Sequence, residues 1–138
     1  MDCTCLTKVD LPDSLIFISV NSFRNTALKK ITIPSNVTSI AHNSFYQSKF
    51  LSEITWKGEN KIEVKGFSFG ETAITHMAFP LNIRNLSSYA FWKCQNFNLL
   101  IIPSTLNITE NDFDCQIVRY NTIEERSLIL NNYDLWNF

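Results

Sequence analysis

The sequence of 138 residues predicts a β-rich solenoid, in which short repeats stack on one another in a single direction. Two observations predict this fold. Similar segments return every 22–24 residues, and the residues that favour strands are abundant, with 15 Ile and 11 Phe against only 3 Gly. The length corresponds to about one domain, and 45% hydrophobic with 18% charged residues is the composition of a globular chain.

Four columns of residues keep the same relative positions in five successive units. They are a first apolar position (Leu6, Leu28, Leu51, Ile74 and Phe97), a second (Val9, Ile31, Ile54, Met77 and Leu100), the residue before the proline position (Leu11, Ile33, Trp56, Phe79 and Ile102) and a phenylalanine (Phe23, Phe45, Phe69, Phe91 and Phe113). A sandwich of unrelated strands would not keep four columns in register, so we expect about five repeats of 22–23 residues.

Each unit contains the elements of one solenoid turn, as the second unit illustrates. Leu28–Ile33 alternates apolar and polar residues, which predicts a parallel strand with its apolar side chains inward. Pro34 follows the strand, where it fixes a turn and removes no ladder hydrogen bond. Val37 and Ile40 return across the convex side, and Phe45 is expected to stack on the phenylalanine of the next unit. A single unit cannot bury its own apolar face, so stability depends on contacts between neighbouring units.

The unit L-x-x-I-x-I-P-x-x-V-x-x-I-x-x-x-S-F-x-x-S resembles the BspA-like, or Treponema-type, leucine-rich repeat, which is known from bacterial surface proteins and from protists. The resemblance covers about residues 3–115 and implies a leucine-rich-repeat solenoid with a role at the cell surface. Two features depart from the family pattern. The third copy has Lys57 in place of the proline, and every copy lacks the glycine that usually precedes the small-residue–Phe pair.

The two ends of the array differ in sequence. A solenoid needs a covered end, because its last repeat otherwise exposes an apolar cross-section. We expect residues 1–115 to form the solenoid and residues 116–138 to fold as a C-terminal cap over the last repeat. Within the cap, Thr122 and Glu125 have the spacing of a capping box, which predicts a short helix over residues 123–130.

The N-terminal end shows no comparable cap. Cys3 lies three residues before Leu6, as Cys94 lies three before Phe97, so Met1–Cys5 has the pattern of the tail of a repeat. The sequence leaves three interpretations open. Further repeats precede the chain, another molecule covers the edge, or the edge is frayed and tolerated.

The sequence contains no set of residues that predicts catalysis, a metal site or a cofactor site. His42 and His76 are the only histidines, and neither has Cys or carboxylate partners at ligand spacing, so we interpret both as surface residues. Cys3, Cys5, Cys94 and Cys115 cannot form one metal site, because Cys94 lies four repeats from Cys3, and we interpret them as free thiols that fill small interior positions. Nucleophile-elbow and phosphate-loop motifs are absent from the sequence. We therefore expect a protein that is not an enzyme.

Charge and hydropathy limit the classes of partner and the location. The net charge of −1 argues against a general nucleic-acid binder, and no apolar run approaches the roughly 18 residues of a membrane span. The chain as written has no secretory signal, which predicts a cytoplasmic protein, whereas the family resemblance implies the cell surface. Three glycosylation sequons, at Asn36, Asn85 and Asn107, would matter only in a secreted protein.

The outward-facing residues of the strands are the candidate binding surface, because they stack into ladders on a rigid frame. Two outward columns follow from the alternation: Lys8, Lys30, Glu53, His76 and Leu99, and Asp10, Thr32, Thr55, Ala78 and Ile101. The first repeats are polar and the last are apolar. Leu99 and Ile101 beside Ala78 therefore predict an exposed apolar patch, unless the C-terminal segment folds back over them.

We expect a non-enzymatic interaction module that binds another protein. The residues expected to contact the partner are Lys8, Lys30, Glu53, His76, Ala78, Leu99 and Ile101. The partner could also cover the N-terminal edge of the array. The alternative, which the family resemblance implies, is a cell-surface module for adhesion or ligand binding.

Overall fold

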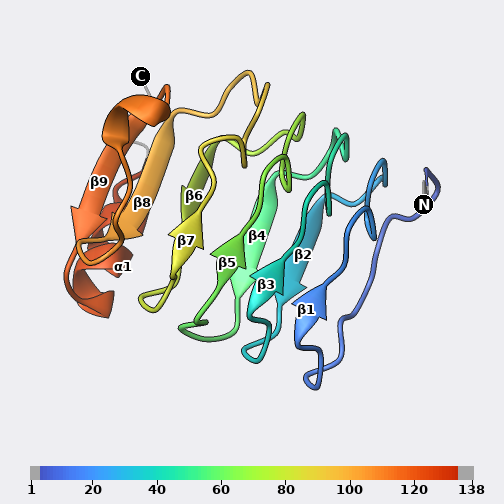
Figure 1. Cartoon of the computed structure of the whole chain (residues 1–138), viewed down its shortest axis with the longest axis horizontal. Coiled ribbons are helices and arrows are strands. Elements are labelled where there is room, and N and C mark those ends of the chain that lie inside the picture. Colours follow the sequence, from blue (N-terminus) through green and yellow to red (C-terminus); the bar gives the residue numbers. More distant parts are fainter. Residues whose placement is uncertain (1–3, 134–138) are drawn as a thin grey trace.

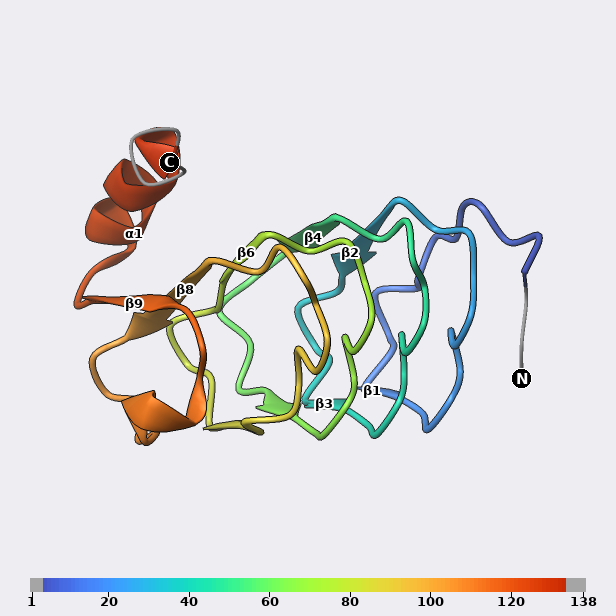
Figure 2. The same cartoon turned by 90° about the horizontal axis from the view of Figure 1, so that it is seen from above.

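Short turns of chain stack along the long axis of the molecule in the computed structural model, which describes residues 4–133 (Figure 1). Each turn runs along one face and returns along the opposite face, so the stack encloses a narrow interior (Figure 2). The N-terminal end of the described chain lies at one end of the stack, and a helix, α1 (Ile123–Asn131), lies at the other. The predicted parallel-strand solenoid is confirmed. Cys3 and residues 134–138 of the predicted cap lie outside the described residues.

The predicted Leu-x-x-Ile-x-Ile segments form the strands of one face. These strands are β2 (Lys30–Ile33), β4 (Glu53–Trp56), β6 (His76–Ala78) and β8 (Leu99–Pro103), and β9 (Gln116–Tyr120) continues the series. All pairings between them are parallel, and β2 pairs with β4 while β6, β8 and β9 form a second sheet. The outward columns are in register as expected, since Lys30 lies opposite Glu53 and Thr32 opposite Thr55.

The return segments form a sheet of their own, which the sequence did not predict. Its strands, in order, are β1 (Phe17–Ile18), β3 (Ser39–Ile40), β5 (Glu63–Val64) and β7 (Asn85–Leu86). Each has two residues, and the second of each pair is buried and aligned with its neighbours. The second face is therefore a narrow parallel ladder that keeps the turns at a regular spacing.

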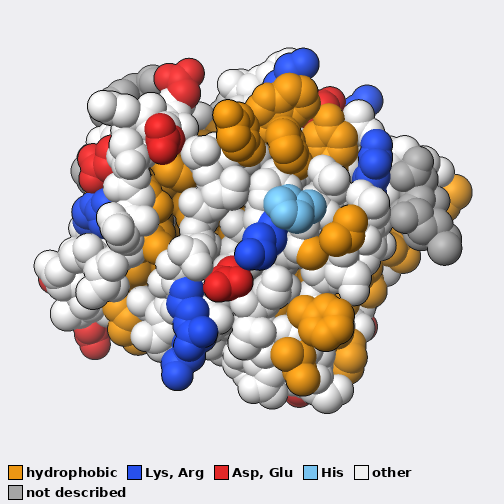
Figure 3. Space-filling view, in the orientation of Figure 1, with side chains coloured by type: hydrophobic (Ala, Val, Ile, Leu, Met, Phe, Trp, Pro, Cys, Tyr) orange, Lys and Arg blue, Asp and Glu red, His pale blue; other side chains and the backbone are white. Residues whose placement is uncertain are grey.

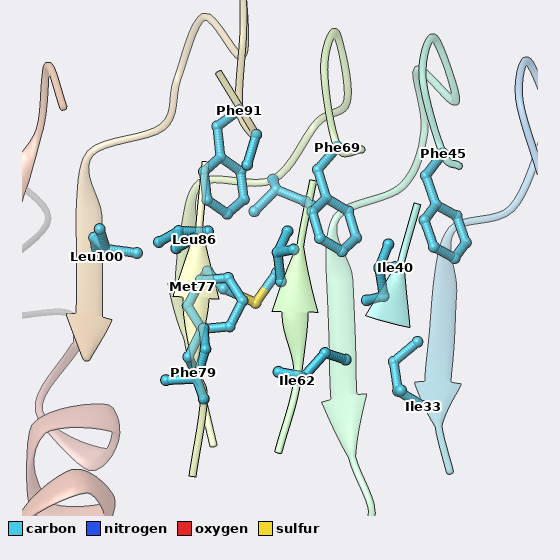
Figure 4. Packing of buried hydrophobic residues seen from close by; sticks show 14 of the residues in the cluster. Ile33, Ile40, Phe45, Ile62, Phe69, Met77, Phe79, Leu86, Phe91 and Leu100 are labelled. Atoms are coloured by element: carbon cyan, nitrogen blue, oxygen red, sulfur yellow. The ribbon is translucent and has the colours of Figure 1, made fainter. Parts of the chain in front are cut away.

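A stack of phenylalanine rings runs through the interior between the two faces (Figure 4). Phe45 and Phe69 are fully buried, with ring centroids 5.4 Å apart and planes inclined by 4°. The stack continues on both sides. The ring centroid of Phe23 lies 5.4 Å from that of Phe45, and the ring centroid of Phe91 lies 5.7 Å from that of Phe69. The expected phenylalanine spine is confirmed from Phe23 to Phe91, where an aromatic contact joins each turn to the next. Beyond these turns Phe91 stacks on Phe97, with ring centroids 4.2 Å apart, in place of the expected Phe113.

A buried polar ladder runs beside the phenylalanine stack, three residues further along each unit. Its members are Thr26, Ser48, Thr72 and Cys94. The hydroxyls of Thr26 and Ser48 lie 2.8 Å apart, and Ser48 donates to the Phe23 carbonyl. The Cys94 thiol donates to the Phe69 carbonyl at 3.0 Å, and burial raises its pKa. Cys94 is thus an interior thiol that satisfies a backbone carbonyl, in agreement with the sequence interpretation.

The turns on either side of each buried phenylalanine contain left-handed residues that are not glycine. Asn21, Asn43 and Phe67 occur two positions before the phenylalanine, and Asn25, Gln47, Glu71 and Lys93 two positions after it, with φ between 52° and 63°. Asparagine tolerates this conformation well, so these turns account for 3 of the 15 asparagines of the chain. The other residue types occupy it at a cost. Asn21, Asn43 and Phe67 stand in the column where the family pattern usually has its glycine.

The C-terminal part covers the last strands. A short 3-10 helix, η1 (Glu110–Asp112), leads into β9, which pairs with β8 across the predicted boundary at residue 115. Helix α1 begins as expected: Thr122 is its N-cap and accepts a hydrogen bond from the Glu125 amide. The Glu125 carboxylate accepts from the amide of Asn121, one residue before the cap. The predicted helix is confirmed and extends to Asn131.

Candidate functional site

The outward face of the first repeats is an open, polar groove. It encloses about 430 Å³ and is lined by three cationic and two anionic side chains, by Thr32 and Thr55 of β2 and β4, and by the apolar residues Val9, Leu11 and Ile31. The charged residues are Lys8, Lys30, Lys57, Asp10 and Glu53, all of which are exposed. Three of the seven predicted contact residues, Lys8, Lys30 and Glu53, therefore lie together in one groove.

A second cavity of about 260 Å³ opens where the strands of this face are not paired. β4 and β6 belong to different sheets and form no ladder with each other, whereas adjacent paired strands lie about 4.8 Å apart. The cavity reaches inward as far as Ile54 and Met77. Trp56 lines it, in the copy in which Lys57 stands in place of the proline. Of the predicted contact residues, Glu53, His76 and Ala78 line it.

Helix α1 forms one wall of this cavity through a bidentate ion pair. Arg126 donates to both carboxylate oxygens of Glu59, at 2.6 Å and 2.8 Å, and its guanidinium lies over the ring of Tyr120. The Glu59 carboxylate also accepts from the Leu81 amide at 2.7 Å. The hydrogen bonds from Arg126 hold the pKa of Glu59 below its ordinary value. The pair is about three-quarters or more buried and fixes α1 against the solenoid.

The expectation that Leu99 and Ile101 form an exposed apolar patch is wrong. Their exposed fractions are 1% and 0%, because Tyr120 packs against them and its hydroxyl donates to the Phe79 carbonyl. The same small cluster includes Ile129 of α1. The physical reason is that the chain's own C-terminal segment is apolar enough to cover these strands. This is the alternative that the sequence left open.

His76 is half-buried rather than fully on the surface. Its ring stacks on that of Tyr133, with centroids 3.9 Å apart, and its Nδ1 lies 3.1 Å from the Thr75 hydroxyl. Burial lowers the pKa of His76, so the neutral imidazole is favoured. Ala78 is likewise partly covered. Exposure along the outward columns therefore decreases from the first repeats toward the cap.

A cluster of aromatic side chains on the turns was not anticipated from the sequence. It consists of Tyr46, Phe67, Tyr89 and Trp92, with Phe67 edge-on to Tyr46 and to Trp92 and stacked on Tyr89. Figure 3, in which the ladder of β1, β3, β5 and β7 faces the viewer, shows hydrophobic side chains gathered along the upper edge of the molecule, with Lys or Arg at their border. The sequence carries the signal in two columns, because Tyr46 and Trp92 directly follow a buried phenylalanine, and Phe67 and Tyr89 precede one by two positions.

Residues 4–133 contain no group of three or more His, Cys, Asp or Glu that could hold a metal ion. His42 is exposed, and the thiols of Cys5, Cys94 and Cys115 are free. Burial raises the pKa of Cys115 to about 11, so its thiolate is scarce at neutral pH. In the same part of the chain, no helix is both long enough and apolar enough to cross a membrane.

The comparisons with known proteins agree with the fold. The family model described as the BspA type leucine-rich repeat region matches residues 1–98 in six copies. The sequence alone indicated about five repeats, and the strand ladder continues beyond the matched residues into β8 and β9. Searches of curated proteins and of solved structures find no significant match. The repeat pattern, the two parallel ladders and this match show that the chain belongs to the BspA-type leucine-rich-repeat family.

Proposed function

We propose that the chain is a non-enzymatic module that binds another protein through the polar groove of its first repeats. One observation carries the proposal: the outward face is open over β2 and β4, whereas the chain's own C-terminal segment covers it over β8. Repeat modules of this family are often used in protein interaction. Lys8, Lys30 and Glu53 are the residues expected to contact the partner.

The charges of the groove indicate what the partner surface presents. Lys8 and Lys30 lie on one outward column, with Glu53 next on that column and Asp10 on the other. Positively and negatively charged side chains line the same groove. This favours a partner with a matching pattern of charges over a uniformly charged polymer such as nucleic acid. Charge complementarity of this kind contributes mainly to specificity and to the association rate.

Site-specific photo-crosslinking in the native cell tests this proposal. A photoreactive p-benzoyl-phenylalanine in place of Thr32 lies in the groove, and the same residue in place of Thr38 lies at an exposed position before β3. We expect one defined protein to be crosslinked from position 32 and not from position 38. The double variant Lys8→Glu, Lys30→Glu should abolish this product. Equal products from both positions, or a product that the double variant retains, would contradict the proposal.

The N-terminal end of the stack is a second surface that a partner could cover. Ile16, Phe17 and Val20 have exposed fractions of 57%, 60% and 54%, and β1 pairs on one edge only, with β3. An exposed strand edge with apolar side chains favours contact with another chain. A photoreactive residue in place of Phe17 tests this contact separately, and a product found there alone would move the binding surface to this end.

The second candidate function is the surface module that the family implies. The specific observation in its favour is that the sequon residues Asn36, Asn85 and Asn107 are all exposed, so the structure could accept glycans there. Mass spectrometry of the protein from its native source discriminates the two functions. Glycan at any of the three positions would favour the surface module, and unmodified asparagine at all three would favour the first proposal.

A further inference from the structure

The aromatic cluster is a rigid surface feature held by the repeat geometry. Tyr46 follows β3, Phe67 follows β5, and Tyr89 and Trp92 follow β7, so three successive turns contribute to it. Phe67 meets the rings of Tyr46 and Trp92 at 78° and 81°, with centroids 6.3 Å and 5.4 Å apart. It stacks on Tyr89 at 5.7 Å. Tyr89 remains 58% exposed, so the cluster ends in an open ring.

Gly70 makes room for this arrangement. It occupies the column of Tyr46 and Trp92, in the turn between them, and these two rings approach to 6.4 Å. A Cβ atom at residue 70 would lie 2.9 Å from Cδ1 of Tyr46, so a side chain there would push that ring away. Four aromatic side chains in contact with one another at the surface are typical of the anchor residues of a protein interface.

Cations border the cluster at both ends. The Arg24 guanidinium lies over Tyr46 at 5.4 Å, and the Lys93 ammonium lies over Trp92 at 4.5 Å. Arg24 belongs to the first of four successive turns and Lys93 to the fourth. Three strand spacings of about 4.8 Å place the two cations about 14 Å apart along the stack. The surface is therefore an aromatic centre between two positive charges.

The backbone around the cluster has no free edge to offer a partner strand. The amides of Asn25 and Gln47 donate to the carbonyls of Tyr46 and Gly70 in the next turn, and the amide of Phe67 donates to that of Tyr89. A ligand must therefore bind through side chains. A polyproline II segment suits this requirement, because it needs no backbone pairing and loses little entropy on docking against aromatic rings.

We infer that this aromatic cluster is a second docking surface, which binds an extended, proline-rich protein segment with an acidic residue at each end. A polyproline II helix rises about 3.1 Å per residue, so acidic residues four to five positions apart would reach both Arg24 and Lys93. Single-stranded nucleic acid is disfavoured. A continuous phosphate backbone would meet the Glu71 carboxylate, which accepts a hydrogen bond from Tyr46 within the cluster, whereas a segment with acidic residues only at its two ends places none there.

The test is a titration of the whole chain with a defined peptide. The probe is fluorescein-labelled Gly-Glu-Pro-Pro-Pro-Pro-Glu-Gly, followed by fluorescence anisotropy, and the matched peptide has Gln in place of both Glu residues. We expect saturable binding of the acidic peptide, weakened about tenfold by Tyr89→Ser and about fivefold by Lys93→Glu. Both residues are exposed, so these variants should remain folded, as circular dichroism can verify. Phe50→Ser, which removes an aromatic ring that is 62% exposed outside the cluster, is the matched control and should change nothing.

Three outcomes would overturn the inference. They are the absence of binding at millimolar peptide, equal affinity for the acidic and the Gln peptides, and binding that Tyr89→Ser and Lys93→Glu leave unchanged. Tighter binding of an oligouridylate of eight nucleotides to the same residues would assign the surface to nucleic acid instead. The inference is independent of the groove of the first repeats, so failure here leaves the proposed function untouched.

Discussion

Replacement of Phe69 by Ala is the perturbation that tests the interior most sharply. Phe69 is fully buried and stacks on Phe45 at 5.4 Å and on Phe91 at 5.7 Å, so its ring belongs to two interfaces between turns. Removal of a buried phenylalanine ring costs about 3–5 kcal/mol, of which each lost stack accounts for about 0.5–1.5 kcal/mol. A domain of ordinary stability, about 5–15 kcal/mol, would lose a large part of it. Equilibrium unfolding in urea measures the difference.

Two further variants control for this interpretation. Phe23→Ala removes a ring that is only partly buried and lies at the first turn, so we expect a smaller loss than for Phe69→Ala. Phe50→Ala removes an exposed ring and should change the free energy of unfolding by less than about 0.5 kcal/mol. A loss below about 1 kcal/mol for Phe69→Ala, or equal losses for the three variants, would refute the stacked interior.

Three other predictions concern the turns and the cap. Gln47→Gly should raise the free energy of unfolding by about 0.5–1 kcal/mol, because residue 47 has a φ of 63°, and thermal unfolding measures this. Arg126→Gln should lower stability by about 1.5–3 kcal/mol in urea unfolding, because it removes the charged hydrogen bonds to Glu59, and an unchanged midpoint would contradict this. Acid should lower the free energy of unfolding, because the folded-state pKa values of Glu59, which binds α1, and of His76 are both lowered. Their stabilising contributions are complete above the ordinary pKa values and are lost as the pH falls through the folded-state values. The urea midpoint should therefore decrease from pH 7.5 to pH 5.5 and again to pH 4. The Glu59→Gln variant should lose the part of this decrease that occurs between pH 5.5 and pH 4.

The repeat period determined most of what could be predicted. The in-register columns of Leu28 and Ile31 predicted inward positions, and the phenylalanine column predicted the stack. These predictions succeed because the members of one column in successive repeats lie next to each other, one strand spacing apart. The repeat pattern in the sequence therefore predicts which residues of neighbouring turns are in contact. Thr122 and Glu125 predicted the start of α1 for a similarly local reason, since capping depends on residues three positions apart.

Several features that escaped prediction depend on contacts between segments that are distant in sequence. The covering of Leu99 and Ile101 depends on where the C-terminal segment turns back, which no local spacing determines. The ion pair between Arg126 and Glu59 joins residues 67 positions apart. The opening between β4 and β6 occurs at the copy that has Lys57 in place of the proline, but this copy keeps its apolar columns, so the period did not predict the loss of pairing. Among the surface features, only the charges of the groove followed directly from the alternation of the strands.

The central claim is that the chain covers its own apolar outward face and leaves a polar groove free for a partner. Paramagnetic relaxation of methyl groups by a soluble gadolinium chelate measures both halves of this claim in one NMR experiment. We predict strong broadening of the Thr32 and Thr55 methyl signals, which line the groove, and little effect on those of Leu99 and Ile101. Broadening of Leu99 and Ile101 equal to that of the two threonines would contradict the account.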